Sequence, residues 1–355
     1  MRSFITIFMI VLAVSGCRLT PSARLLPLFP TSTPPVSAPS KQITFNTLPL
    51  AERWRWSGNI DFLSISPSRS TTIEGQIIVI RREWADQRVT VFDADTGRSI
   101  WESNVIPNVV RSLSVDEEHV YIGTITYVQA FDLETGKNLW RSVEQPSMKR
   151  GGLVVHSTEK HVEVYDIFEP VVYILDPATG QIVDQIPKNL FFRWNGIDYS
   201  IVRGNYLLEA RDVTSNEKLW SYAFPGYIHR WPAFAGDIML LTARGQIFGI
   251  KARTGEIIWQ TTDNQPVFTH PEYITGVALQ GDLAYALRYD AAIVGFNPET
   301  GEQVGIIQMM PDRTLEDDKG DVTHYAIATS DRFVAVYYGN SQELIVFEKV
   351  NGVDK

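Results

Sequence analysis

Among the side chains that could bind a metal ion or take part in catalysis, aspartate recurs at the most regular positions in this sequence. Asp93, Asp132, Asp176 and Asp212 each follow an alternating apolar run and stand four residues before a glycine or asparagine. A calcium site needs several oxygen ligands that converge on one point. A lone aspartate in the pattern Asp-x-x-Thr-Gly instead caps a turn with its own side chain. Because the copies lie on separate repeats, we predict turn caps and no metal site.

The familiar catalytic signatures are absent from the chain. The sequence contains no Gly-x-Ser-x-Gly, no His-Glu-x-x-His and no glycine-rich phosphate loop, and its six histidines form no pattern of their own. We therefore assign no catalytic residue. The longest connection, residues 309–321, is strongly acidic; we interpret it as a solvated loop, with a cation or basic-partner site as the alternative.

Arginines recur ten residues after three tryptophans of the repeat, and Arg193 occupies the equivalent place in a fourth copy. Aromatic residues surround them, and arginine with aromatic side chains is the composition enriched at interaction hot spots. We predict a binding face for an anionic peptide or ligand, made of Arg111, Arg150, Arg193, Trp194, Tyr227, Arg230 and Trp231. The alternative is that each arginine ties down its own loop through backbone carbonyls or a nearby carboxylate.

Cys17 is the single cysteine, so the chain can form no internal disulfide. It directly follows a segment that is typical of an N-terminal export signal. Arg2 precedes an apolar run of eleven residues from Phe4 to Val14, too short for a mature transmembrane helix but typical of a secretory signal. The segment 12–17 resembles a bacterial lipobox, in which small residues precede a cysteine that is lipidated after cleavage. We predict a signal peptide over 1–16, with a non-lipidated signal or an uncleaved anchor as the alternative.

The segment 17–50 is rich in Pro, Ser and Thr and carries almost no charge, so we expect a semi-extended tether without a core. A lipid on Cys17 would hold the protein to a membrane, at the cell envelope or cell surface. The folded body would then begin at residue 51.

A repeat fills residues 51–355. Seven hairpin positions, 97, 136, 180, 216, 255, 301 and 352, lie 36 to 51 residues apart. At each one an alternating strand enters a turn and another leaves it, and glycine or asparagine supplies the positive φ that a short hairpin needs. Two further β-like runs precede each hairpin. Four-stranded units of this length indicate an all-β propeller, most simply of seven blades, with eight as the alternative.

Two features specify how the ring holds together. Tryptophan stands four residues after the turn position in several copies, and we interpret these rings as wedges between blades. The segment Glu52–Trp56 resembles an outer strand without its own hairpin, so we predict that it completes the last blade and closes the ring. The predicted structural anchors are Gly97, Trp101, Gly136, Trp140, Gly180, Trp220, Gly255, Trp259 and Gly301. The arginines would then lie at one mouth of the central channel.

The pattern from Ala130 to Trp140 resembles the tryptophan-docking motif of pyrroloquinoline-quinone-like propeller repeats. Two kinds of protein share that repeat: quinoprotein dehydrogenases, and non-enzymatic lipoproteins such as the propeller subunit of the outer-membrane β-barrel assembly machinery. The resemblance to the enzymes implies a calcium site, a catalytic Asp and commonly a vicinal cysteine pair. The chain lacks that cysteine pair, so we expect no quinone cofactor.

Net charge is −9, which argues against nucleic acid as the partner. We therefore expect a monomeric, lipid-anchored propeller that acts as a protein-binding or assembly scaffold. The alternative is an envelope enzyme, either a degenerate quinoprotein oxidoreductase or a polysaccharide-active propeller.

Overall fold

The computed structural model describes residues 45–65, 75–83, 85–142, 152–158, 160–166, 171–187, 192–202, 206–226, 228–261, 277–288, 290–308, 325–339 and 341–350. The chain divides into two units, Met1–Thr33 and Pro34–Lys355, and every described residue belongs to the second. All regular elements in the described ranges are β-strands, so this part of the chain offers no helix able to cross a membrane.

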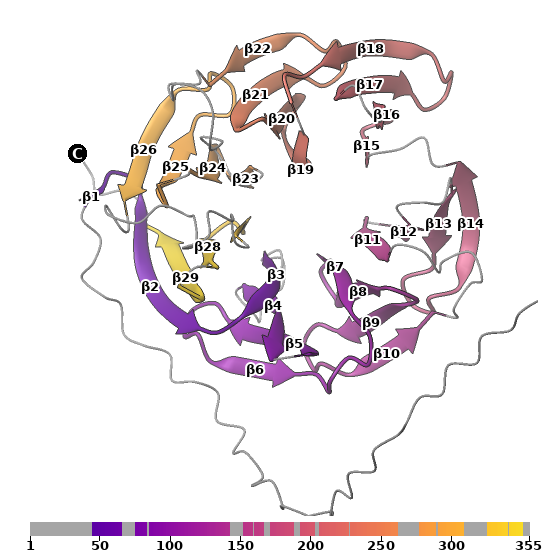
Figure 1. The fold of residues 1–355 in the computed structure, drawn as a ribbon, viewed down its shortest axis with the longest axis vertical. Coiled ribbons are helices and arrows are strands. Elements are labelled where there is room, and N and C mark those ends of the chain that lie inside the picture. Colours follow the sequence, from indigo (N-terminus) through magenta and orange to yellow (C-terminus); the bar gives the residue numbers. More distant parts are fainter. Residues whose placement is uncertain are drawn as a thin grey trace, which may run out of the picture. The chain divides into compact units, whose positions relative to one another are not determined.

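The described strands form seven antiparallel sheets arranged around one axis (Figure 1). We number these blades along the chain. Blade 1 comprises β3 (Ile60–Ile65), β4 (Gln76–Glu83), β5 (Asp86–Asp93) and β6 (Ser99–Glu102). Blade 2 comprises β7 (Val110–Val115), β8 (His119–Thr124), β9 (Val128–Asp132) and β10 (Asn138–Arg141). Blade 3 comprises β11 (Leu153–Ser157), β12 (Val162–Asp166), β13 (Val171–Leu175) and β14 (Ile182–Pro187).

The second half of the ring repeats this order. Blade 4 comprises β15 (Phe192–Trp194), β16 (Ile197–Val202), β17 (Leu207–Asp212) and β18 (Lys218–Ala223). Blade 5 comprises β19 (Ile228–Ala235), β20 (Ile238–Ala243), β21 (Gln246–Lys251) and β22 (Ile257–Gln260). Blade 6 comprises β23 (Ala278–Gln280), β24 (Leu283–Leu287), β25 (Ile293–Phe296) and β26 (Gln303–Gln308), with β1 (Phe45–Asn46) added outside. Blade 7 comprises β27 (Tyr325–Thr329), β28 (Phe333–Tyr338), β29 (Glu343–Lys349) and β2 (Leu50–Ser57). The prediction of a seven-bladed propeller is confirmed.

The outer hairpin of each repeat is built by its aspartate and glycine. In blade 2, Asp132 Oδ1 accepts hydrogen bonds from the backbone N–H and the hydroxyl of Thr135, at 2.7 and 2.5 Å. Gly136 then adopts φ +70°, and its N–H donates to the Asp132 carbonyl at 2.9 Å. The same arrangement recurs where Asn216 replaces glycine, at φ +57°. The recurring aspartates are therefore used within their own turns.

The hairpin tryptophans lock each blade to the next one. Trp101 of blade 1 lies against Gly136 of blade 2, and its indole Nε1–H donates to the Leu133 carbonyl at 2.8 Å. A Cβ on Gly136 would lie 2.5 Å from the indole, so only glycine leaves room for the ring. Equivalent Trp–Gly locks join Trp140 to Gly180, Trp220 to Gly255 and Trp259 to Gly301.

The N-terminal strand closes the ring, as predicted. β2 pairs antiparallel with β29, with Trp54 opposite Val346. This register gives Trp54 the place of a hairpin tryptophan: it packs on Gly97 and donates to the Ala94 carbonyl at 2.7 Å. Blades 7 and 1 are thus joined by a lock supplied from the start of the folded region. An ion-pair network reinforces it, in which Arg53 and Arg332 share Asp95 and Glu348.

The sheets begin earlier than the boundary at residue 51. Phe45 and Asn46 pair with β26, and Leu50 pairs with Lys349. Between them, buried Leu48 packs against Gly295 and Gly305. Gly305 stands where other blades carry the locking tryptophan, so residues 45–50 of the predicted tether in fact complete blades 6 and 7.

Candidate functional site

Three of the four predicted arginines begin the innermost strand of a blade. Arg111 is the second residue of β7, Arg193 the second of β15 and Arg230 the third of β19. Every blade is ordered from its innermost to its outermost strand, so these strand starts lie at the same mouth of the central channel. We call this end of the channel the entry mouth.

Arg111 is exposed, and none of the ion pairs among the described residues involves it. Its aliphatic stem lies over the backbone of Gly152, directly before blade 3. A Cβ at Gly152 would lie 2.4 Å from Arg111 Cγ, and Gly152 adopts φ +97°. The close approach positions the Arg111 side chain across the boundary between blades 2 and 3 and leaves its guanidinium available.

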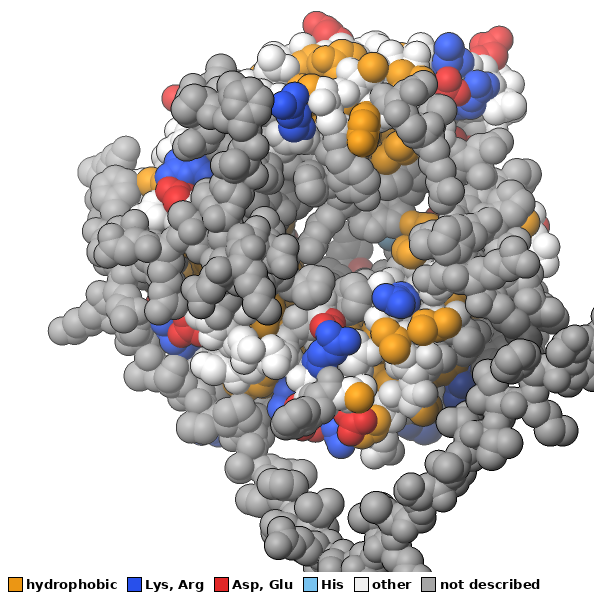
Figure 2. Space-filling view, in the orientation of Figure 1, with side chains coloured by type: hydrophobic (Ala, Val, Ile, Leu, Met, Phe, Trp, Pro, Cys, Tyr) orange, Lys and Arg blue, Asp and Glu red, His pale blue; other side chains and the backbone are white. Residues whose placement is uncertain are grey.

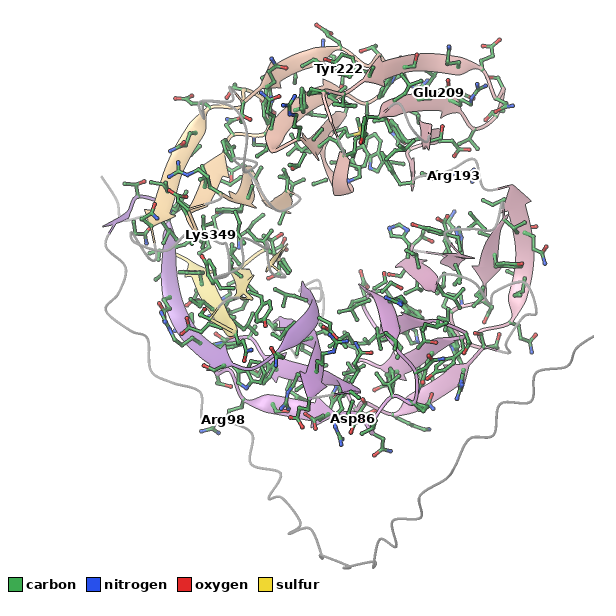
Figure 3. The ribbon with its side chains drawn as sticks, in the orientation of Figure 1. Asp86, Arg98, Arg193, Glu209, Tyr222 and Lys349 are labelled. Atoms are coloured by element: carbon green, nitrogen blue, oxygen red, sulfur yellow. The ribbon has the colours of Figure 1, made fainter. Side chains whose placement is uncertain are left out.

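Arg193 is held within its own blade. Its Nε and Nη2 donate to the two carboxylate oxygens of Asp198 at 2.5 and 3.0 Å. This two-pronged hydrogen bond raises the pKa of the Arg193 guanidinium, against the opposing effect of burial. Figure 3 shows Arg193 on the inner side of blade 4, whereas Arg98 lies on the outer rim. For Arg193, the alternative interpretation of an arginine tied to a local carboxylate describes the geometry.

Trp194 joins blade 4 to blade 5. Its ring stacks on Phe234 of β19, with centroids 4.3 Å apart and planes inclined by only 2°. Phe192 stacks on Tyr199 in the same region, with centroids 4.4 Å apart. The aromatic side chains near Arg193 therefore pack against one another, and Trp194 keeps part of its surface accessible.

Other members of the predicted face are outside the described residues. Arg150 and Tyr227 lie outside them, as do the side chains of Arg230 and Trp231 and the acidic connection 309–321. Among the side chains coloured in Figure 2, basic and acidic groups lie in mixed clusters around a central hollow. The two described arginine side chains of the predicted face therefore differ: Arg111 is exposed, whereas Arg193 is paired with Asp198.

A local signal for the Arg193–Asp198 pair was present in the sequence but not used. Asn195 and Gly196 have φ of +44° and +74°, the left-handed pair typical of a two-residue hairpin. In such a hairpin Arg193 must lie opposite Asp198, and the observed register is that one. An Asn-Gly turn flanked by opposite charges would have identified this partner.

Two titratable groups with shifted pKa values, Asp132 and Tyr199, form hydrogen bonds within a turn and between blades. The Thr135 hydroxyl lowers the pKa of the Asp132 carboxyl through its hydrogen bond. Burial raises the pKa of Tyr199, whose hydroxyl donates to the Ala252 carbonyl of blade 5. Within the described ranges no group of three or more His, Cys, Asp or Glu side chains is placed to hold a metal ion.

Comparison with known proteins shows a partial similarity to an enzyme and an extended similarity to a solved structure. A stretch of 106 residues, 28% of this chain, is 32% identical to the quinoprotein alcohol dehydrogenase PedH of Pseudomonas putida. That stretch spans only 18% of the dehydrogenase's length. The crystal structure of BamB from Moraxella catarrhalis matches 86% of this chain and 99% of its own, with a TM-score of 0.52 and 14% sequence identity. This second likeness shows a shared fold.

The family model described as outer membrane protein assembly factor BamB matches residues 51–189 and 198–353. The matched residues cover well over half of the chain and include strands of every blade. This chain therefore belongs to the family of the outer membrane protein assembly factor BamB.

Proposed function

We propose that this chain is an exported, lipid-anchored scaffold of the cell envelope that binds a protein partner at its entry mouth. The match to the BamB family over the whole propeller carries the proposal. Members of that family are named for the assembly of outer membrane proteins, which points to an envelope location and to protein partners. A rigid ring with varied loops serves recognition without requiring catalysis.

Arg111 supports the choice of surface. Arg111 is exposed, no described carboxylate pairs with it, and its stem lies over the backbone of Gly152. A fixed and exposed guanidinium loses little side-chain entropy when it binds a carboxylate. We therefore propose an acidic segment of the partner protein as its ligand.

Site-specific photo-crosslinking in the native envelope tests the surface. A photoreactive amino acid replaces Val109, which is 38% exposed two residues before Arg111, or Asp282 at the opposite mouth, where the β23–β24 hairpin leaves Asp282 89% exposed. We expect one discrete protein adduct from position 109 and none from position 282. Equal adducts from both positions, or none from position 109, would contradict the proposal.

The anchor is tested separately. We propose that Cys17 is lipidated after removal of residues 1–16, which would place the tether between membrane and propeller. Metabolic labelling with an alkyne-bearing fatty acid should mark the wild-type protein, and Cys17→Ser should abolish the label and release the protein from membranes. A labelled Cys17→Ser protein would contradict the assignment.

A second candidate function is a quinoprotein oxidoreductase, which only the PedH similarity favours. The residues present do not fit the cofactor: the chain has a single cysteine, and its described part has no cluster suited to a metal ion. Addition of pyrroloquinoline quinone and Ca²⁺ to the purified protein, followed by absorbance and a dye-reduction assay with alcohols, distinguishes the two. Dye reduction that depends on the quinone would favour the enzyme.

A further inference from the structure

Two of the seven interfaces between blades lack the Trp–Gly lock, and one of these two has no apolar side chain in its place. Five interfaces carry a tryptophan on a glycine, and the interface between blades 6 and 7 has Leu48 filling the space beside Gly305. Between blades 3 and 4, the tryptophan position is held by Asp184 and the glycine position by Asn216. We call this interface the 3/4 seam.

Both halves of the lock are missing at the same seam. In the Trp–Gly locks a Cβ on the glycine would lie 2.3 to 2.7 Å from the ring, so Asn216 leaves no room for an indole in that position. The hairpin that contains Asn216 is also more exposed to solvent than its counterparts. Val213, which follows the capping aspartate, is 37% exposed, whereas the equivalent Leu133 and Ala252 are 7% and 1% exposed. The hairpin of blade 4 therefore keeps its turn but lacks the tryptophan that covers the locked hairpins.

The apolar core shows the same break. Six clusters of buried apolar side chains each span two neighbouring blades, at every interface except the 3/4 seam, as far as the described residues go. Buried apolar area is the main force that holds such surfaces together. The seam thus lacks the largest contribution that stabilises the other interfaces.

Strand alternation explains why no cluster forms there. Leu208 and Ala210 of β17 pack in the cluster shared with blade 5, so the intervening Glu209 and the following Arg211 face blade 3. These two side chains form an ion pair at 2.6 Å. Asp198 of β16 faces the same way, because its neighbour Tyr199 bonds to blade 5. Blade 4 therefore presents charged groups to the seam.

Blade 3 presents both apolar and polar side chains to the seam. Val172 and Ile174 of β13 face blade 4 and are buried, but neither belongs to one of the six clusters. Val162 and Val164 of β12 pack toward blade 2, which turns Glu163 toward blade 4. Glu163 also contacts His161, with Nε2 and Oε1 3.2 Å apart. Its charge adds to the effect of Asp198 that raises the pKa of Arg193, which places the two blades' charges within electrostatic reach. Because blade 4 meets these side chains with charged groups, the seam pairs less apolar surface than the interfaces that hold a shared cluster.

We infer that the ring opens and closes reversibly at the 3/4 seam, while the other six interfaces stay closed. The opened ring gives lateral access to the central channel, which a fully locked propeller offers only through its two mouths. This inference concerns the ring itself and holds whether or not the proposed function is correct.

Distance measurements between paired spin labels test the inference. In the full chain carrying Cys17→Ser, labels on Val183→Cys and Ser215→Cys span the seam between the outer strand of blade 3 and the hairpin of blade 4. The matched control is Leu139→Cys with Thr179→Cys, which occupies the same repeat positions across the locked interface of blades 2 and 3. All four positions are exposed.

We expect the seam pair to show a second population at longer distance, of about 10%, and the control pair to show one narrow distribution. The repair variant Asp184→Trp with Asn216→Gly should remove the longer population. A seam distribution as narrow as the control would overturn the inference, and so would a longer population in both pairs. The comparison of the two unrepaired pairs decides the question even where the repair variant does not fold.

Discussion

The Trp–Gly lock makes a quantitative prediction at Gly136. Replacement by alanine adds a Cβ that would lie 2.5 Å from the Trp101 ring, at a residue with φ +70°. The left-handed backbone costs an alanine about 1–2 kcal/mol. Displacement of a packed ring costs a further 1–3 kcal/mol or so, and loss of the indole hydrogen bond to Leu133 about 1 kcal/mol. We expect Gly136→Ala to lower the free energy of unfolding by roughly 3–6 kcal/mol in total.

Gly236 provides the matched control. It has φ +58°, and a Cβ built on it would meet no atom within 4 Å. Gly236→Ala should therefore cost only the backbone term, about 1–2 kcal/mol. Urea denaturation followed by circular dichroism measures both variants, with unchanged m-values as the check that the same surface unfolds.

A double-mutant cycle then isolates the contact. In a Trp101→Ala background the ring is absent, so Gly136→Ala should cost no more than the control substitution. Equal losses for Gly136→Ala and Gly236→Ala in the wild-type background would refute the lock as the reason for the glycine. So would a loss at Gly136 that persists in full without the tryptophan.

Three further predictions concern other parts of the ring. Leu48→Ala should lower the free energy of unfolding by about 2–4 kcal/mol, because it leaves a cavity beside Gly305; an unchanged urea midpoint would contradict the role of Leu48. Asp95→Asn should cost only about 1 kcal/mol, because its ion pairs are partly exposed, and 1 M salt should reduce the difference from wild type. The lowered pKa of Asp132 means that its stabilisation is present above the pKa of the unfolded chain, about 3.9, and is lost as the pH falls through the lower folded value. The stability difference between wild type and Asp132→Asn should therefore be constant from about pH 7 to 5 and shrink below about pH 4; a difference independent of pH would contradict it.

The turns of the repeat could be predicted from the sequence because the residues that form each turn are close together in the chain. A capping aspartate, a residue with positive φ and a tryptophan four residues later all lie within one hairpin, so their pattern is visible without tertiary structure. The closing strand was also predictable, since Glu52–Trp56 alternates like an outer strand but lacks a hairpin of its own.

The features that escaped prediction depend on contacts between distant residues. Leu48 fills the space beside Gly305 across more than 250 residues of sequence, and complementarity of volume leaves no local pattern. The equivalence of Trp54 with the hairpin tryptophans appears only in the register of β2 against β29. The polar seam follows from which face of β17 meets blade 3, and alternation alone does not say which neighbour a face will meet.

The two described arginine side chains of the candidate binding face differ in their contacts. Arg193 is paired within a hairpin that the sequence could have specified through Asn195 and Gly196. Arg111 differs because its stem lies on Gly152, and the spacing from Trp101 gave no information on that contact. The repeat was enough to predict that the arginines lie at one mouth of the channel. Whether each arginine is paired with a carboxylate depends on the side chains that the fold places beside it.

The affinity of the captured partner for charge-reversed variants tests the proposed scaffold most directly. Arg111→Glu reverses the charge at the entry mouth, and Asp282→Lys makes the opposite change at the far mouth, where the side chain is 89% exposed. The account predicts that Arg111→Glu weakens binding at least tenfold, about 1.4 kcal/mol, and that Asp282→Lys leaves the dissociation constant unchanged. An Arg111→Glu protein that binds its partner as tightly as wild type would contradict it.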